Sequence, residues 1–238
     1  MHLWMIASFI AYFVKGLCGF ANTLVFTTIL SFGASNASIS PVDLLLGYPA
    51  NLILTWKNRK RLEAKVWLPL AALVLAGSVP GAILLKNADT RAIKLVFGIV
   101  IVALGAELLS REFGGSRPRA SKPALAMIGI AAGVLCGLFG VGALLAAYVS
   151  RVTETDSAFK ANISAVFIAD NTFRVVLYSA LGLLTIDTLK TALLLIPFGL
   201  LGLFAGIRCG SHVNERIIRR LTAALLVLSG LSLILKNL

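Results

Sequence analysis

The sequence predicts an all-α polytopic membrane protein built from two inverted repeats. Each repeat is expected to hold a re-entrant or broken helical hairpin and three transmembrane helices. Three observations lead there: an apolar composition, a series of long apolar blocks, and a likeness between the two halves. Of the 238 residues, 58% are hydrophobic and only 13% are charged, whereas a soluble domain carries about 25% charged residues. So few charges cannot cover a globule, and much of the surface must face lipid.

Eight hydrophobic blocks fill most of the chain. A helix needs about 20 apolar residues to cross a bilayer. The first and fifth blocks are longer than one span needs and too short for two, and each is interrupted by polar residues or glycines. We expect each of them to form two half-helices that meet near the middle of the membrane. The blocks run roughly over 2–32, 41–56, 66–85, 92–110, 123–149, 158–181, 189–207 and 217–235.

The boundary between the halves is expected where the apolar blocks are interrupted by Gly-Gly, two prolines and four basic residues, over 111–123. This composition is typical of a linker. The predicted organisation is therefore a first repeat over 1–110, a basic cytoplasmic linker over 111–122 and a second repeat over 123–238.

Matched glycines support a duplication of the halves. A shift of 121 aligns residues 15–19 with 136–140, and a shift of 125 aligns Gly77 and Gly81 with Gly202 and Gly206. Pairs of small residues four apart also predict close helix packing, and we expect that role for these four glycines.

The formal net charge of +12 suggests a nucleic-acid partner until the basic residues are located. If both long blocks are hairpins that enter and leave on one side, most basic residues share one face of the membrane. If all eight blocks cross, the two faces are almost equally basic. The positive-inside rule favours the first arrangement. We therefore expect no nucleic-acid partner, a second repeat inverted relative to the first, and cytoplasmic loops at 57–65, 111–122 and 208–220.

Two basic residues, Lys15 and Arg174, belong to neither face. A charge near the bilayer centre costs roughly 2.5–3.5 kcal/mol, so it marks a functional candidate. Lys15 precedes the predicted bend of the first hairpin, where a new helix N-terminus would offer free N–H groups to an anion. The alternative is that Lys15 extends to the interface. The candidate ligand-binding residues of this hairpin are Lys15, Gly16, Gly19, Asn22 and Thr23.

The sixth block carries Asp170, Asn171 and Arg174 in an apolar span. Asp170 and Arg174 are four residues apart, so they share a helix face and can pair. Arg174 offers a planar fork to an oxyanion, and Asp170 is a candidate for carrying a coupled proton. A purely structural ion pair remains the alternative. Three further candidates complete the predicted site: Asn51, which follows a proline, and Gly140 and Gly142 at the break of the fifth block.

Other chemistries find no support in the sequence. There is no P-loop, no HExxH motif and no paired-carboxylate site, so an enzyme, a metal site and a cofactor are not expected. Cys18, Cys136 and Cys209 all lie in apolar stretches and are interpreted as small buried hydrophobic residues.

The two hairpin motifs are Gly16-Leu17-Cys18-Gly19-Phe20, and Gly137-Leu138-Phe139-Gly140-Val141-Gly142 after the basic loop. Together they resemble the TauE/SafE sulfite exporter family. Where that family often continues its glycine run, Ala21-Asn22-Thr23 and Ala143-Leu144-Leu145 stand here. The resemblance implies a multi-pass transporter of the bacterial inner membrane that moves sulfite, an organosulfonate or another small anion. An anion channel of the same fold and a non-transporting assembly partner stay open as alternatives, as does a homo-oligomer.

Overall fold

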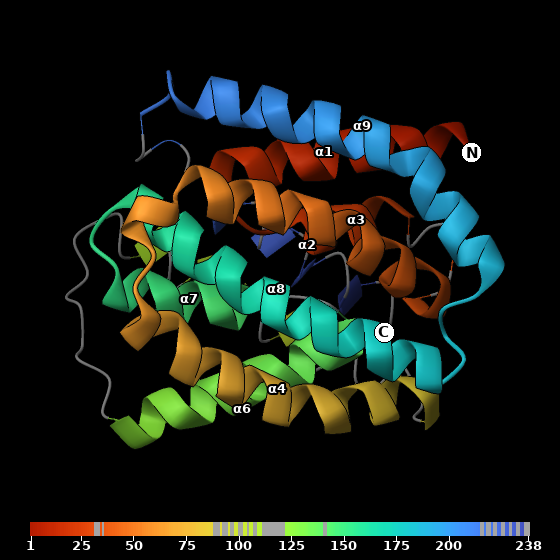
Figure 1. Ribbon diagram of the computed structural model, residues 1–238, viewed down its shortest axis with the longest axis horizontal. Helices are drawn as coiled ribbons and strands as arrows, with labels where there is room; N and C mark the ends of the chain where they lie inside the picture. Colours follow the sequence, from red (N-terminus) through yellow and green to blue (C-terminus); the bar gives the residue numbers. More distant parts are fainter. Residues whose placement is uncertain are drawn as a thin grey trace.

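The computed structural model describes residues 1–30, 34, 36–87, 122–139 and 142–214, together with scattered residues between 91 and 110 and between 217 and 235. Every regular element of this described part is a helix, and the helices lie alongside one another in a bundle (Figure 1). The predicted all-α class is confirmed. The elements are α1 (His2–Cys18), α2 (Asn22–Leu30), α3 (Asn36–Lys57), the short η1 (Arg59–Arg61), α4 (Ala64–Asn87), α6 (Lys122–Phe139), α7 (Ala143–Val152), α8 (Asp156–Ala180) and α9 (Ile186–Gly210).

The first long block breaks between α1 and α2, as expected. Gly19 adopts φ 85° and donates its N–H to Lys15 O at 2.7 Å, which ends α1 with a left-handed residue. Ala21 also has a positive φ of 71°, which is strained for a residue with a Cβ. Trp4 near the start of α1 meets Phe26 in α2 edge-on at 5.8 Å. Helix α2 therefore turns back along α1.

The fifth block breaks as well. Helix α6 ends at Phe139 and α7 begins at Ala143, with Gly142 at its N-cap. Gly140 lies outside the described residues. Helix α7 packs against α6, so each long block forms two helices in contact.

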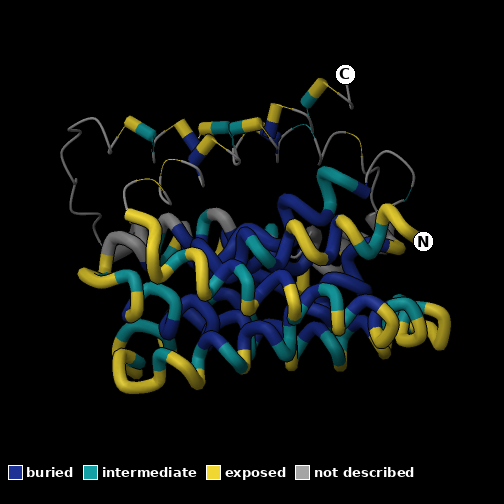
Figure 2. The backbone as a smooth tube through the Cα atoms, turned by 90° about the horizontal axis from the view of Figure 1, so that it is seen from above, coloured by how far each residue is buried: buried dark blue, intermediate teal, exposed yellow. Residues whose placement is uncertain are grey.

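Helices α3 and α8 form the centre of the bundle. They pack against each other, α9 and α1 lie on one side of them, and α4 and α6 lie on the other (Figure 1). Buried residues run through the middle of the described helices, and exposed residues cover the outward sides (Figure 2). The buried centre is therefore lined by helices from both ends of the sequence.

Glycines allow the flanking helices to approach at backbone distance. A Cβ at Gly206 would lie 2.1 Å from Phe13 O, and one at Gly81 would lie 2.3 Å from Val134 O. Gly77 and Gly202 are equally close to Ile130 O and Phe9 O. The expected packing role of these glycines is confirmed, because any side chain there would separate α1 from α9 and α4 from α6.

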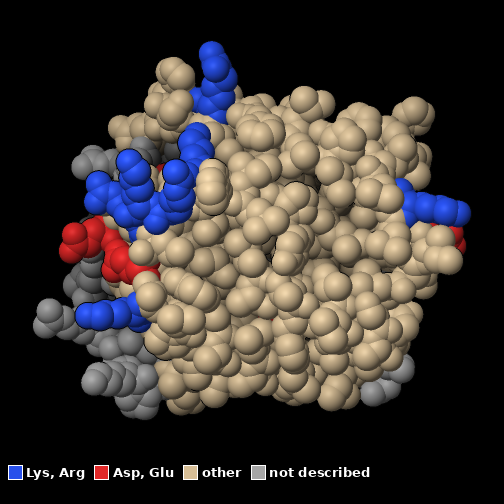
Figure 3. All heavy atoms as spheres, in the orientation of Figure 1, with Lys and Arg blue, Asp and Glu red and all other residues tan. Residues whose placement is uncertain are grey.

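The charged side chains on the surface drawn in Figure 3 lie at the two ends of the bundle. On the face drawn in Figure 3, the broad band between the ends carries none. Helices α4 and α9 contain segments long and apolar enough to cross a membrane. Large apolar side chains of α9 face outward, among them Leu193 at 68% exposed and Phe204 at 54%. This is the surface that lipid requires.

The basic loops after α3 and after α9 lie at the same end of the bundle as the start of α6 (Figure 1). This end carries Arg59, Lys60 and Arg61 in η1, and Arg208 in the last turn of α9. Residues 111–121 of the predicted linker lie outside the described part. That this end faces the cytoplasm stays a prediction.

One cysteine departs from expectation. Cys18 and Cys136 are buried, but Cys209 is exposed. Cys209 lies in the last turn of α9, after the glycines that pack against α1 at backbone distance.

Candidate functional site

Lys15 lies in the interior. Its side chain is 1% exposed, and its Nζ donates to Asn22 Oδ1 at 2.9 Å. The same Nζ lies 5.1 Å from the centroid of the Phe167 ring on α8, a cation–π contact. A lysine bonded inward in this way does not extend to the surface of the bundle, which argues against the alternative that Lys15 reaches the interface.

Asp43 on α3 is the acidic residue near Lys15, and it is not among the site residues that the sequence predicts. Its carboxylate accepts hydrogen bonds from Tyr12 OH at 3.0 Å, from Asn22 Nδ2 at 3.1 and 3.3 Å, and from Thr23 Oγ1. We call Tyr12, Lys15, Asn22, Thr23 and Asp43 the Lys15 cluster. A spacing of four residues places Asp43, Gly47 and Asn51 on one face of α3, and this polar face was a usable signal.

Arg174 on α8 is the second buried cation. It is 2% exposed, and its Nη2 donates to Tyr178 OH at 2.6 Å and to Ser40 Oγ at 3.1 Å. Its Nη1 lies 3.8 Å from Asp170 Oδ2. The predicted pairing of Asp170 with Arg174 along one helix face is confirmed.

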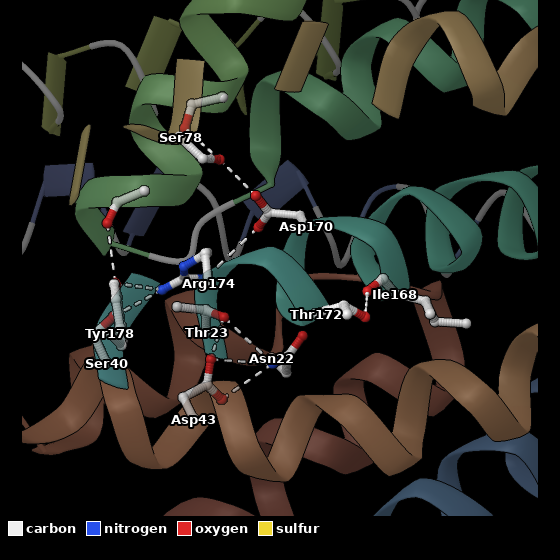
Figure 4. Close-up of polar contacts among 12 residues, drawn as sticks. Asn22, Thr23, Ser40, Asp43, Ser78, Ile168, Asp170, Thr172, Arg174 and Tyr178 are labelled. Atoms are coloured by element: carbon white, nitrogen blue, oxygen red, sulfur yellow. Dashed lines mark hydrogen bonds and ion pairs between the residues drawn. The ribbon is translucent and has the colours of Figure 1, made fainter. Parts of the chain in front are cut away.

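Asp170 and Tyr178 tie this cation to α4 and α6. Ser78 of α4 donates to Asp170 Oδ1 at 2.5 Å, and Tyr178 OH contacts Gly137 O of α6 at 3.0 Å. Two atoms stay without a hydrogen bond among the described residues, Asp170 Oδ2 and Arg174 Nε. We call Ser40, Ser78, Asp170, Arg174 and Tyr178 the Arg174 cluster (Figure 4).

The two clusters meet on α3. Ser40 binds Arg174, and Asp43, one helical turn further along, binds the hairpin residues (Figure 4). Gly47 follows by another turn. A Cβ at Gly47 would lie 3.4 Å from Asn171 Nδ2 and 3.6 Å from Tyr12 OH. These are ordinary van der Waals distances, and they show that the buried Asn171 of α8 lies beside Gly47 and near the Lys15 cluster.

Of the remaining predicted residues, Asn51 is 2% exposed and its Oδ1 receives no hydrogen bond from the described part of the chain. It lies on the polar face of α3, one turn beyond Gly47. Its role in binding stays a prediction.

Three predicted glycines lie at packing contacts. A Cβ at Gly16 would lie 2.4 Å from Leu203 O, one at Gly19 would lie 2.7 Å from Lys160 Cγ, and one at Gly142 would lie 2.1 Å from Phe167 Cζ. The backbone contact of Gly16 requires glycine, and Gly19 is favoured by its positive φ, whereas a side chain at Gly142 would have to displace the Phe167 ring. Phe167 thereby separates Gly142, at the second hairpin break, from Lys15 near the first, so both breaks border the same ring. Ligand binding by these glycines stays a prediction.

An all-helical bundle with an apolar outer face, charges at its ends and a polar centre is typical of a polytopic membrane protein. The sequence model of the family described as sulfite exporter TauE/SafE matches residues 4–233. The chain belongs to this family, and the resemblance in its hairpin motifs is confirmed. It is accordingly a membrane transporter rather than an enzyme, and its class of activity is anion transport. No curated protein and no solved structure matches the chain.

Proposed function

We propose that this protein is a secondary transporter of the bacterial inner membrane that carries a small sulfur oxyanion, either sulfite or an organosulfonate. The anion binds at the middle of the membrane, between the two repeats, where the Lys15 cluster and the Arg174 cluster meet. One observation carries the proposal: two cations, Lys15 and Arg174, are almost fully buried in two clusters that meet on α3. A buried cation is costly in lipid and is kept where it binds something.

The donors suit an oxyanion with several oxygens. Arg174 presents a guanidinium fork, and Lys15 presents an ammonium group whose one hydrogen bond to a described residue goes to Asn22. Charge-assisted hydrogen bonds of this kind are stronger than neutral ones. Asn22, Thr23 and Asn171 add neutral donors from α2 and α8. A sulfite or sulfonate group has three oxygens in a pyramid, which suits donors that converge on it from several directions.

The packing of the helices supports the inverted-repeat plan. If α6 corresponds to α1 and α9 to α4, the contact of α1 with α9 has its counterpart in the contact of α6 with α4. Gly16 against Gly206 then matches Gly137 against Gly81. Transporters with inverted repeats bind their substrates between broken helices near the midplane, and both hairpin breaks border α8 here.

Transport by alternating access requires the anion to be exposed to each side in turn. We propose that the two repeats rock against each other about the hairpins. Asn51 and Gly142 then lie along the route between the central site and the membrane surfaces, and Gly16 and Gly19 keep the first hairpin closely packed. A role for Gly140 in binding stays a prediction of the sequence.

Reconstituted protein tests this function. Liposomes that carry the purified protein in their membrane should accumulate radiolabelled sulfite or methanesulfonate above the external concentration when a pH gradient is imposed. The initial rate of uptake should saturate as the anion concentration rises. Chloride and acetate, which lack the three-oxygen pyramid, should compete poorly. Uptake that never saturates and stops at equal concentrations would indicate a channel, and no flux at all would indicate a non-transporting partner.

The orientation has its own test. In a protein lacking Cys18, Cys136 and Cys209, a single cysteine at position 60 or 211 should react with a membrane-impermeant reagent from the cytoplasmic side only. A cysteine at position 190 should react from the outside only. Labelling of positions 60 and 211 from opposite sides would contradict the inverted arrangement.

A further inference from the structure

The proposed transport function gives no role to Asp43, although its carboxylate accepts several buried hydrogen bonds. Asp43 is 4% exposed, and its two carboxylate oxygens accept from Tyr12 of α1 and from Asn22 and Thr23 of α2. Hydroxyl and amide donors that converge on a buried carboxylate are the kind of donors that bind a free oxyanion. Asp43 therefore occupies the donors that a transported anion needs.

The charges of the Lys15 cluster show why Asp43 and a bound anion compete for the same donors. Lys15 and Asp43 contribute one positive and one negative charge, so the cluster is neutral as it stands. An added anion would leave a net negative charge in a buried site, which is strongly unfavourable. A proton on Asp43 restores neutrality and at the same time releases Tyr12, Asn22 and Thr23 to the anion.

We propose that Asp43 takes up one proton for each monovalent anion bound, so that the protein is a proton–anion symporter. This inference rests on the proposed function and names its coupling ion. The proton enters with the anion and binds a carboxylate oxygen of Asp43. The hairpin donors then turn from the carboxylate to the anion, and both ligands leave together on the other side. No bond other than that to the proton is made or broken.

Other ionisable groups surround Asp43 and must be separated from it. Helix α1 presents Tyr12 and Lys15, and α8 presents Arg174 and Tyr178 through Ser40, with Asp170 behind them. Helix α2 carries no ionisable side chain, and the charged residues of α9 stand near its ends: Asp187, Lys190 and Arg208. Asp170 is the one other buried acid in the described part of the chain.

The test counts protons on binding. Methanesulfonate is the probe because it stays ionised, so any proton taken up belongs to the protein. In weakly buffered detergent solution, the parent protein should take up about one proton per anion bound, and its Kd should rise about tenfold per pH unit over the range in which that proton is taken up. Asp43→Asn should bind the anion with a Kd independent of pH and with no proton uptake.

Three comparisons make the assignment specific. Asp187→Asn, the same change at the exposed start of α9, should keep the proton uptake of the parent. Asp170→Asn should also keep it. Thr23→Val removes a hydrogen bond to the Asp43 carboxylate without changing charge, so the pH at which affinity falls should move upward. This last variant tests the assignment even if Asp43→Asn does not fold.

The outcomes separate this inference from the proposed function. If the parent protein binds neither methanesulfonate nor sulfite, the proposed function fails and the inference fails with it. If the parent binds anion without proton uptake, only the inference is overturned. Proton uptake that persists in Asp43→Asn, or that disappears in Asp170→Asn alone, places the proton elsewhere and also overturns it.

Discussion

The Lys15 cluster and the Arg174 cluster each contain one buried cation and one buried carboxylate, but their hydrogen bonds are distributed in opposite ways. In the Lys15 cluster the acid is saturated: Asp43 accepts from three side chains, whereas Lys15 Nζ donates only to Asn22 among the described residues. In the Arg174 cluster it is the cation that makes more hydrogen bonds. Arg174 donates to Tyr178 and Ser40, whereas Asp170 Oδ2 has no hydrogen bond within the described part.

This difference assigns different work to the two cations. An ammonium group has three N–H donors, so Lys15 has capacity to bind an anion directly. Arg174 is held by neutral oxygens that fix the plane of its fork, so it serves orientation and selectivity. The clusters also come from different parts of the chain, the hairpin α1–α2 and the helix α8, and α3 joins them.

Loss of Lys15 should have the largest effect. Lys15→Ala should weaken methanesulfonate binding at least about 30-fold, because removing one partner of a buried charge pair costs about 2–5 kcal/mol. Isothermal titration calorimetry measures the change. Lys190→Ala, a loss of lysine near the start of α9, is the matched control. Unchanged affinity in a well-folded Lys15→Ala protein would remove Lys15 from the site.

Arg174→Lys should have the next largest effect. The charge remains, but the fork is lost, and we expect about tenfold weaker binding of methanesulfonate, as for one charge-assisted hydrogen bond. Chloride, a sphere without directional acceptors, should lose much less. Competition titrations with both anions give the ratio, and an equal loss for both would show that the fork does not select.

Asp170→Asn should weaken binding only about threefold. The amide keeps a hydrogen-bond acceptor for Ser78 and stays near the guanidinium, so part of the orientation of Arg174 survives. Uptake driven by a pH gradient should continue in this variant. If binding is intact but gradient-driven accumulation stops, Asp170 carries the proton instead of orienting Arg174.

The two buried tyrosines offer the smallest and most direct comparison. Tyr178→Phe removes a partner of Arg174 and a contact to Gly137 O, and should lower stability by about 1 kcal/mol or more. Tyr12→Phe should cost less, because Asp43 keeps its bonds to Asn22 and Thr23. Thermal unfolding of both variants in one detergent tests the order, and the reverse order would contradict the contrast between the clusters.

The sequence predicts the helical class, both hairpin breaks and both buried cations, because each rests on a local signal. A glycine run marks a break, and a charge inside an apolar block marks an interior site. Asp43 escaped prediction because it lies only two residues inside its block, where an acid looks interfacial. Its partners Tyr12 and Thr23 belong to other helices, so only the packing of α3 against the hairpin reveals them.

Gly16 and Gly142 show the opposite limit. Their place beside the breaks predicts contact with a ligand, and this stays a prediction. The structure adds that Gly16 lies against the backbone of α9 and Gly142 against the Phe167 ring of α8. The sequence shows that a glycine is present but does not identify the residue that packs against it. The neighbour is set by the fold of distant segments, α9 for Gly16 and α8 for Gly142.

The contact between α1 and α9 has a consequence for biosynthesis. Ser8 in α1 donates to Leu195 O in α9, a residue 187 positions later in the chain. At a synthesis rate of about 5–20 residues per second, α1 leaves the ribosome roughly 10–40 s before its partner exists. During that interval the face of α1 that will meet α9 has no α9 to cover it, although α2, α3 and later α8, whose Phe167 contacts Lys15, are made earlier. The hydrogen bonds of Lys15 to Asn22, and of the hairpin to Asp43, can therefore form before the last quarter of the chain arrives.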